Sequence, residues 1–153
     1  MLRSFAVTAL LLASATVWPS AALADPKLLH NEPLVGIATA RQVVRGVPGG
    51  GVPWVVAEGS RAKLDADGEL RVKVKGLVFA PGTSNAGTRG TVDQVFASVV
   101  CADGRLVDTG SVPLSLAGDA KIEEDVTLPS GCADPIVLVR ITGAGRWIAE
   151  AGL

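Results

Sequence analysis

The sequence predicts an all-β protein: a single-domain β-sandwich of immunoglobulin-like, Greek-key architecture, with a small β-barrel as the alternative. Three observations support this prediction. No window of the 153 residues carries an apolar stripe with the 3.6-residue period of a helix. About seven to nine short apolar or alternating runs are typical of strands. The 18 glycines and eight of the 9 prolines lie after residue 24 and separate these runs at intervals of roughly 8–12 residues, as turns do in sandwiches.

The first half of the folded region holds the clearest strand. Asp67-Gly68 is expected to form a tight hairpin turn, because Asp-Gly tolerates positive φ angles. The strand that leaves this turn alternates strictly, so one of its faces is expected in the core and the other in water. Its apolar residues are Leu70, Val72 and Val74, and its cations are Arg71, Lys73 and Lys75. The expected strands of this half are residues 34–44, 52–58, 60–64 and 70–75, with a Pro/Gly loop at 47–51.

The second half begins with a long loop, residues 79–90, rich in Gly, Thr, Ser and Asn. Asp103-Gly104 is a second hairpin signal. Residues 136–141 are apolar on both faces apart from Arg140, which favours a central strand. The expected strands of this half are residues 91–102, 105–116, 120–128, 136–141 and 146–151.

Residues 1–24 have the pattern of a secretory signal peptide. Arg3 precedes an apolar run from Phe5 to Val17, and Ala22-Leu23-Ala24 offers small residues where a signal peptidase cuts. The run of about 13 residues is shorter than the roughly 20 of a membrane-spanning helix. Cleavage leaves 153 − 24 = 129 residues that begin at Asp25. We expect a flexible arm over residues 25–33, the β-sandwich domain over 34–153, and a secreted or cell-envelope location.

The two cysteines, Cys101 and Cys132, both lie in the predicted domain. An exported protein meets an oxidising compartment, and two cysteines allow a single intramolecular pairing, so we expect one disulfide. Their spacing is not C-x-x-C, which argues against a redox-active pair, and two sulfurs without a histidine cluster make a poor zinc site. No Trp lies between them, so the likeness to immunoglobulins is one of architecture only.

The charge balance excludes two classes of partner. The chain has 14 Lys and Arg against 15 Asp and Glu, a net charge of −1. Without Arg3 the mature chain has 13 against 15, a net charge of −2. Nucleic acids and anionic membranes both attract a basic excess, so neither is an expected partner. No other apolar segment is long enough to span a bilayer, and the expected partner is extracellular or part of the cell envelope.

The residues that could carry catalysis are few. The only histidine, His30, lies near the predicted mature N-terminus, and the chain has no Tyr. A histidine-dependent triad is therefore not expected in the folded domain, and we predict no catalytic residue, no metal and no cofactor. Asp65, Asp67 and Glu69 place oxygen ligands around a tight turn, as a calcium site does, but their spacing fails the EF-hand pattern. A solvated hairpin is the favoured interpretation.

Two charged residues in apolar runs need an explanation. Glu124 shares the parity of Ile122 and Val126, so simple alternation would point it into the core. A β-bulge, or an edge position near a strand end, would turn it outward. A pairing of Glu124 with Arg140 is the alternative.

The Gly-rich loops are the candidate binding surfaces. The loop at residues 47–53 leads into Trp54 but lacks the Lys and the helix start of a phosphate-binding loop. Trp54 is either a core residue behind a flexible turn or a binding-loop residue. Asn85, in the 79–90 loop, is the second candidate binding-loop residue. Its Asn-Ala-Gly sequence is not an N-glycosylation acceptor.

The stretch from Gly46 to Gly152 resembles an uncharacterised family of small exported bacterial proteins with one β-rich domain and two cysteines. The resemblance lies in Arg45-Gly46-Val47 with Pro53-Trp54, residues 70–77, Gly118-Asp119-Ala120-Lys121-Ile122 and residues 128–137. It implies export and a compact β-domain. It implies no activity and no functional residue.

These observations predict a secreted, non-enzymatic β-domain protein that binds a partner through its Gly-rich loops. The alternative is a structural or envelope-associated accessory protein. A carboxylate-dependent hydrolase is a third hypothesis, which requires a deep pocket with two Asp or Glu side chains at catalytic separation.

Overall fold

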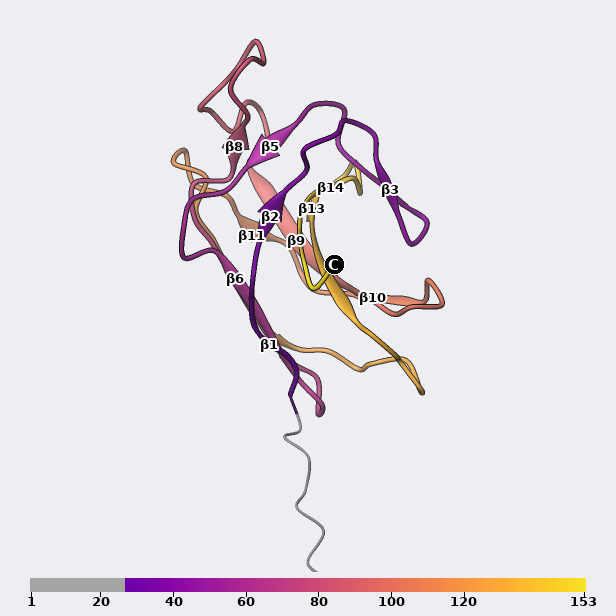
Figure 1. The fold of residues 1–153 in the computed structure, drawn as a ribbon. Coiled ribbons are helices and arrows are strands. Elements are labelled where there is room, and N and C mark those ends of the chain that lie inside the picture. The colour runs from indigo at the N-terminus through magenta and orange to yellow at the C-terminus, as the bar shows by residue number, and fades with distance from the viewer. Residues whose placement is uncertain (1–26) are drawn as a thin grey trace, which may run out of the picture.

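A computed structural model describes residues 27–153 and confirms the all-β prediction (Figure 1). The predicted signal peptide and its cleavage site lie outside the described residues. Two antiparallel sheets make up most of the fold, and β6 and β10 lie on opposite sides of the molecule. No helix in the described part of the chain is long and apolar enough to cross a membrane.

The two main sheets are consistent with a β-sandwich, while the immunoglobulin-like strand order stays a prediction. The first sheet has the order β1 (Lys27–Pro33), β6 (Arg61–Asp65), β7 (Glu69–Val74), β12 (Ala120–Asp125). The second has the order β10 (Leu106–Asp108), β9 (Gln94–Val100), β13 (Ile136–Ile141), β14 (Trp147–Ala151), β2 (Val35–Gly36), and β11 (Val112–Pro113) also pairs with β9. Two short pairs complete the fold: β3 (Val43–Val44) with β4 (Val47–Pro48), and β5 (Trp54–Val55) with β8 (Val78–Phe79).

Alternation along the strands builds the core. In β7, the buried residues Leu70, Val72 and Val74 are at most 1% exposed, while the residues between them face solvent. In β9, Val95, Ala97 and Val99 are fully buried. Residues of both sheets belong to one hydrophobic cluster. Each fully buried Leu or Val contributes about 1.5–3 kcal/mol relative to an exposed one.

The predicted central strand, residues 136–141, is confirmed as β13, which lies between β9 and β14. Its first four residues are all fully buried. The side of the second sheet away from the first sheet is covered in part by the β3–β4 hairpin. Arg45, at the tip of this hairpin, donates hydrogen bonds to the backbone oxygens of Val100 and Asp134, and the indole of Trp147 donates to Gln42 O.

The expected single strand at residues 34–44 is wrong, because this range holds two short strands, β2 and β3. The expected loop at 47–51 is wrong in part, because Val47–Pro48 forms β4. Arg45 and Gly46 have φ angles of 46° and 83°, which suit the two central residues of a tight hairpin turn. Arginine is not a typical residue for this position, so the turn carries no strong sequence signal. The expected strand at residues 105–116 is likewise divided, into β10 and β11.

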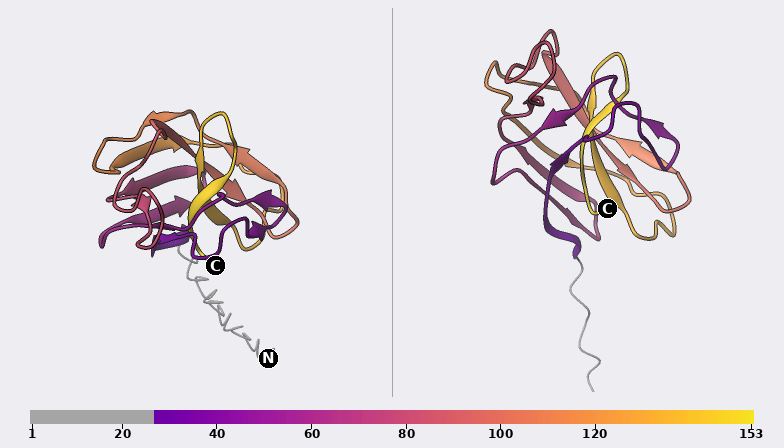
Figure 2. Two further views of the ribbon diagram at one scale, coloured as in Figure 1. Left: turned by 90° about the horizontal axis from the view of Figure 1, so that it is seen from above. Right: turned by 45° about the horizontal axis from the view of Figure 1, so that its top comes forward.

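The expected flexible arm over residues 25–33 is wrong for its described part, residues 27–33, which form β1. This strand pairs with β6, with two register shifts, and Leu29 is 7% exposed. The C-terminus lies beside β1 (Figure 2), where a Cβ added to Gly152 would come within 3.0 Å of a methyl group of Leu29. The position of residues 27–33 near the N-terminus suggested a flexible segment, but the burial of Leu29 holds this segment against the domain.

The predicted disulfide between Cys101 and Cys132 is present, with a Cα–Cα distance of 5.1 Å. It joins the end of β9 to the segment before β13. A bridge across 31 positions stabilises the fold by roughly 3–4 kcal/mol in the loop-entropy account. It is compatible with an extracellular location.

Candidate functional site

The Gly-rich loop before Trp54 is packed and offers no free binding tip. Trp54 is 2% exposed, and its ring centroid lies 4.3 Å from that of Phe79. Gly50 donates a hydrogen bond to Trp147 O. A Cβ added to Gly49 would lie 2.5 Å from Gln42 O, so the chain there is in close backbone contact. Trp54 is therefore a core residue, and its assignment as a binding-loop residue is corrected.

Asn85 lies exposed in the loop after β8. Its backbone oxygen accepts hydrogen bonds from the amide and the hydroxyl of Thr88, which close a turn. Phe79, whose ring contacts Trp54, accepts a hydrogen bond from Gly87 N at the base of the same loop. The two candidate binding-loop residues thus belong to different environments, one buried and one at the surface.

The acidic hairpin between β6 and β7 has the predicted turn. Gly68 has a φ of 99°, and a Cβ there would lie 2.0 Å from Val126 O, so only glycine fits. Lys63 pairs with Asp65 at 3.1 Å, and Arg71 forms an ion pair with Glu69. Among residues 27–153, no group of three His, Cys, Asp or Glu side chains is placed to hold a metal ion. His30 lies exposed on β1.

Glu124 is exposed on the edge strand β12, one residue before its end, which is one of the two expected explanations. It is not turned outward, however, because it pairs in register with buried Leu70 and so stays on the inward side, as simple alternation predicts. Its Oε2 accepts a hydrogen bond from Gly110 N at 2.8 Å. The alternative pairing with Arg140 is wrong, because Arg140 faces Asp108 instead, at 3.3 Å. Strand order decides this: β10 and β13 both flank β9, whereas β12 belongs to the other sheet.

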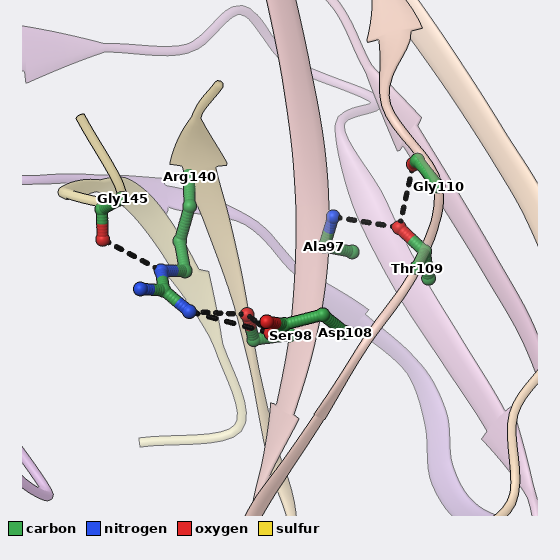
Figure 3. A network of polar contacts seen from close by, with 7 residues as sticks. All are labelled: Ala97, Ser98, Asp108, Thr109, Gly110, Arg140 and Gly145. Atoms are coloured by element: carbon green, nitrogen blue, oxygen red, sulfur yellow. Dashed lines mark hydrogen bonds and ion pairs between the residues drawn. The ribbon is translucent and has the colours of Figure 1, made fainter. Parts of the chain in front are cut away.

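Arg140 is the centre of a polar network across β9, β10 and β13 (Figure 3). Its guanidinium donates to Gly145 O at 2.7 Å and to Ser98 Oγ at 3.0 Å, and it lies 5.0 Å from the ring centroid of Phe96. Ser98 in turn donates to Asp108. Ser98 is fully buried and bonded to both charged groups, so the network ties three strands together and leaves no free nucleophile.

The most distinctive surface is the outer face of the first sheet. Strand register places Arg61 opposite Lys73, and Lys73 opposite Lys121. The next row places Lys63 opposite Arg71, and Arg71 opposite Glu123. Directly opposed residues of antiparallel strands share a face, so these side chains all project to the same side. We call the five cations the cationic face: Arg61, Lys63, Arg71, Lys73 and Lys121.

The cationic face is locally positive in a protein that is slightly negative overall. Five cations and Glu123 sum to +4, and the ion-pair partners Asp65 and Glu69 lower this to +2, against a net charge of −1 for the whole chain. Together with Asn31 they line a surface hollow of about 280 Å³. Arg61 and Lys73 form no ion pair with any acidic group of residues 27–153, while Lys121 pairs with Glu123 at 2.9 Å. A hydrogen bond to Glu69 raises the pKa of Arg71, which keeps it charged.

Sequence reasoning found the alternating cations of β7 but not this face. Arg71, Lys73 and Lys75 were expected in water, and they are exposed. Arg61 and Lys121 come from strands that precede and follow β7 at different distances along the chain. The predicted Asp-Gly hairpin is consistent with Arg61 lying beside Lys73, because the turn of a hairpin sets its register. The pairing of β12 with β7, which adds Lys121, leaves no signal in the local sequence.

Four carboxylates of the described residues share one surface hollow of about 240 Å³, lined by Glu69, Glu123, Glu124 and Asp125. Glu123, Glu124 and Asp125 are exposed, and Glu124 accepts a hydrogen bond from Gly110 N. A general acid needs a carboxyl that its surroundings hold protonated. Burial raises the pKa of Glu150. Its cross-strand neighbours are Leu138 and Val35, which cannot take part in acid–base chemistry.

No protein-family model matches the sequence, and neither a curated protein nor a solved structure matches it.

Proposed function

We propose that the protein is an exported, non-enzymatic binding module that recognises a polyanion through its cationic face. The observation that carries the proposal is the row Arg61–Lys73–Lys121 on three adjacent strands. Like charges directly opposite one another on a sheet destabilise it by up to about 1 kcal/mol per pair. Anionic groups of a ligand would neutralise this repulsion between the cations. The relief of repulsion would therefore add to the free energy of binding.

The surroundings of the row support a rigid, preformed site. The pairing of β6 with β7 and of β7 with β12 runs without a register shift. The opposite face of β7 is packed in the core, with Val72 1% exposed. Side chains anchored on such a sheet lose little backbone freedom when a ligand binds, which favours affinity.

The composition of the face argues for a charged polymer and against nucleic acid or membrane. Single-stranded nucleic acids are bound by aromatic platforms as well as cations, and no aromatic side chain lines this hollow. A membrane-binding face needs large apolar side chains beside its cations. The apolar residues of the hollow, Val72 and Ile122, are each 1% exposed.

Export rests on the pattern of residues 1–24 and is supported by the Cys101–Cys132 disulfide. The proposal moves the binding surface from the Gly-rich loops to a sheet face. A structural or envelope-associated accessory protein remains the alternative function, and it requires no ligand on the cationic face.

The test is a titration of the purified protein with fluorescently labelled polygalacturonate, dextran sulfate and polyphosphate at low and high salt. The double variant Arg61→Gln/Lys73→Gln removes the two cations without an ion pair. We expect it to weaken binding about tenfold or more and to reduce the salt dependence, since fewer counterions are exchanged.

Arg41→Gln is the matched control, because Arg41 is exposed, lies in the segment before the β3–β4 hairpin and makes the same charge change. It should bind like the wild type. Failure of the wild type to bind any of the three polymers, or equal binding by the double variant and the control, would overturn the proposal in favour of the accessory role.

A further inference from the structure

A second hollow adjoins the first along β7. It has a volume of about 750 Å³ and is lined by Lys75, Val112, Pro113 and Asp119, together with Lys73 and Lys121 of the cationic face. The first hollow has the same two lysines in its lining. The two hollows therefore meet at Lys73 and Lys121, and they form one continuous surface rather than two separate sites.

The cations of β7 run along this surface in a straight line. Arg71, Lys73 and Lys75 alternate with core residues, so they project to one side at every second position. With a rise of roughly 3.4 Å per residue, the row from Arg71 to Lys75 is about 14 Å long. A single small anion cannot contact all three cations, whereas a linear polymer with regularly repeated charges can.

The far end of the row is held in place although it lies just beyond the strand. The hydroxyl of Ser60, which is 4% exposed, accepts a hydrogen bond from Lys75 N at 2.9 Å and lies 2.8 Å from Ala57 O and 3.1 Å from Lys75 O, which share its one hydrogen. Ala57 N also donates to Lys75 O. The backbone of Lys75 is thus fixed on both of its polar groups, and its side chain starts from a defined point.

The two ends of the row differ in charge. Beyond Arg71 lie Glu69 and, opposite it on β12, Asp125, which repel an anion. Near Lys75, the carboxylate of Asp119 already accepts a hydrogen bond from Gly76 N. A polyanion is therefore expected to extend past the Lys75 end and to stop at the Arg71 end.

The polar groups between the cations point to the chemistry of the polymer. Asn31, Glu123 and Asp119 offer hydrogen-bond acceptors in the two hollows. Two of these acceptors, Glu123 and Asp119, are anions. They would repel polyphosphate, which has no hydrogen-bond donors to offer them. A polysaccharide of uronic acids presents carboxylates to the lysines and arginines and hydroxyl donors to these acceptors. Val112 and Pro113 add an apolar wall suited to the C–H face of a sugar ring.

We infer that the ligand is a linear, carboxylated polysaccharide that lies along β7 across both hollows. This inference rests on the proposed function and specifies its ligand. It predicts that affinity depends on polymer length, because a longer chain engages Lys75 as well as the cationic face.

The experiment measures binding of oligogalacturonates of two sugars and of about eight sugars to the wild type and three single variants by isothermal titration calorimetry. We expect the octamer to bind about tenfold or more tightly than the dimer. Lys73→Gln should weaken binding of both oligomers. Lys75→Gln should weaken only the octamer, by about fivefold or more, and Arg41→Gln should weaken neither. Circular dichroism melts verify that each variant folds.

The outcomes separate this inference from the proposed function. If polyphosphate binds in a way that depends on Lys73 while no oligogalacturonate binds, the ligand class is wrong and polyanion binding stands. If both oligomers bind equally, or Lys75→Gln affects both alike, the extended binding mode is wrong. If no polyanion binds, both proposals fail.

Discussion

Oε2 of Glu124 accepts a hydrogen bond from the backbone N–H of Gly110 at 2.8 Å and so joins the edge of the first sheet to the second. Glu124 lies on β12, and Gly110 lies between β10 and β11. The cross-strand partner of Glu124 is Leu70, a fully buried residue, so Glu124 projects from the inward side at the sandwich margin. Its carboxylate closes that margin with a charged acceptor instead of an apolar side chain.

Glu124→Ala should lower the free energy of unfolding by about 1 kcal/mol, because a charge-assisted hydrogen bond between the sheets is lost at an exposed site. Urea denaturation followed by tryptophan fluorescence measures this. Glu123→Ala is the matched control: Glu123 neighbours Glu124 but pairs only with exposed Lys121, so its loss should cost less than about 0.5 kcal/mol. Equal effects of the two substitutions would contradict the inter-sheet role.

Arg140→Met should lower the free energy of unfolding by about 1–2 kcal/mol. The Arg140 side chain is 14% exposed, and its removal leaves Gly145 O and Ser98 Oγ without a donor. Asp108 is 45% exposed, so the ion pair itself contributes in the lower range of surface pairs.

Two double-mutant cycles locate the partner of Arg140. Arg140→Met combined with Asp108→Asn should show a coupling of about 0.5 kcal/mol. Arg140→Met combined with Glu124→Gln should be additive, because these residues lie on different sheets and have different partners. Coupling in the second cycle and none in the first would reverse the assignment. Thermal or urea unfolding of the three single variants, the two double variants and the wild type gives both values.

Trp54→Ala should destabilise the protein by about 3–5 kcal/mol, since it removes a fully buried aromatic side chain and its contact with Phe79. Trp54→Phe keeps most of the packing and should cost clearly less. At a temperature where both variants are folded, neither should change the affinity for a polyanion. A variant that is stable but has lost binding would instead return Trp54 to the binding surface.

Glu150→Gln should stabilise the protein at pH 7, with the gain lost as the solution is acidified. Burial raises the pKa of the Glu150 carboxyl, while a hydrogen bond from the Leu153 backbone opposes this shift. Its Oε2 is buried without a hydrogen-bond partner in the described structure. Because the folded-state pKa lies above the unfolded one, the ionised form costs stability at neutral pH, and this cost disappears below the unfolded-state pKa of about 4.3.

Urea unfolding at pH 7 and pH 4 tests this dependence. Glu58→Gln is the control, because Glu58 is fully exposed and its replacement should change stability little at either pH. A Glu150→Gln variant that is less stable than the wild type at pH 7 would show that the charge is compensated in the folded state.

The predictable parts of this fold are those with local signals. Alternation in β7, the Asp-Gly turn at Gly68 and the run of buried residues in β13 each follow from short-range chemistry. The disulfide followed from compartment and count. The parts that could not be predicted depend on contacts between distant segments. Leu29 is buried where β1 pairs with β6 and contacts the C-terminal segment, and the side chain of Arg45 in the β3–β4 turn reaches Val100 and Asp134.

The candidate site follows the same division. Arg71, Lys73 and Lys75 could be assigned to solvent from their alternation, which says nothing about their neighbours. The hairpin at Gly68 brings Arg61 beside Lys73, whereas the placement of Lys121 depends on the pairing of β12 with β7, which the local sequence does not encode. The charged network of Arg140 was missed for the same reason, since Asp108 is its partner only through β9.

The β3–β4 hairpin has a consequence for how the protein could act on a polymer. By covering part of the second sheet, where β13 is buried on both sides, it leaves the first sheet as the more open of the two faces. A binder with a single such face is monovalent: it can coat a polysaccharide chain, but alone it cannot cross-link two chains into a gel. Adding the protein to a polygalacturonate solution should therefore not raise the viscosity, whereas a lectin that bridges two chains would raise it.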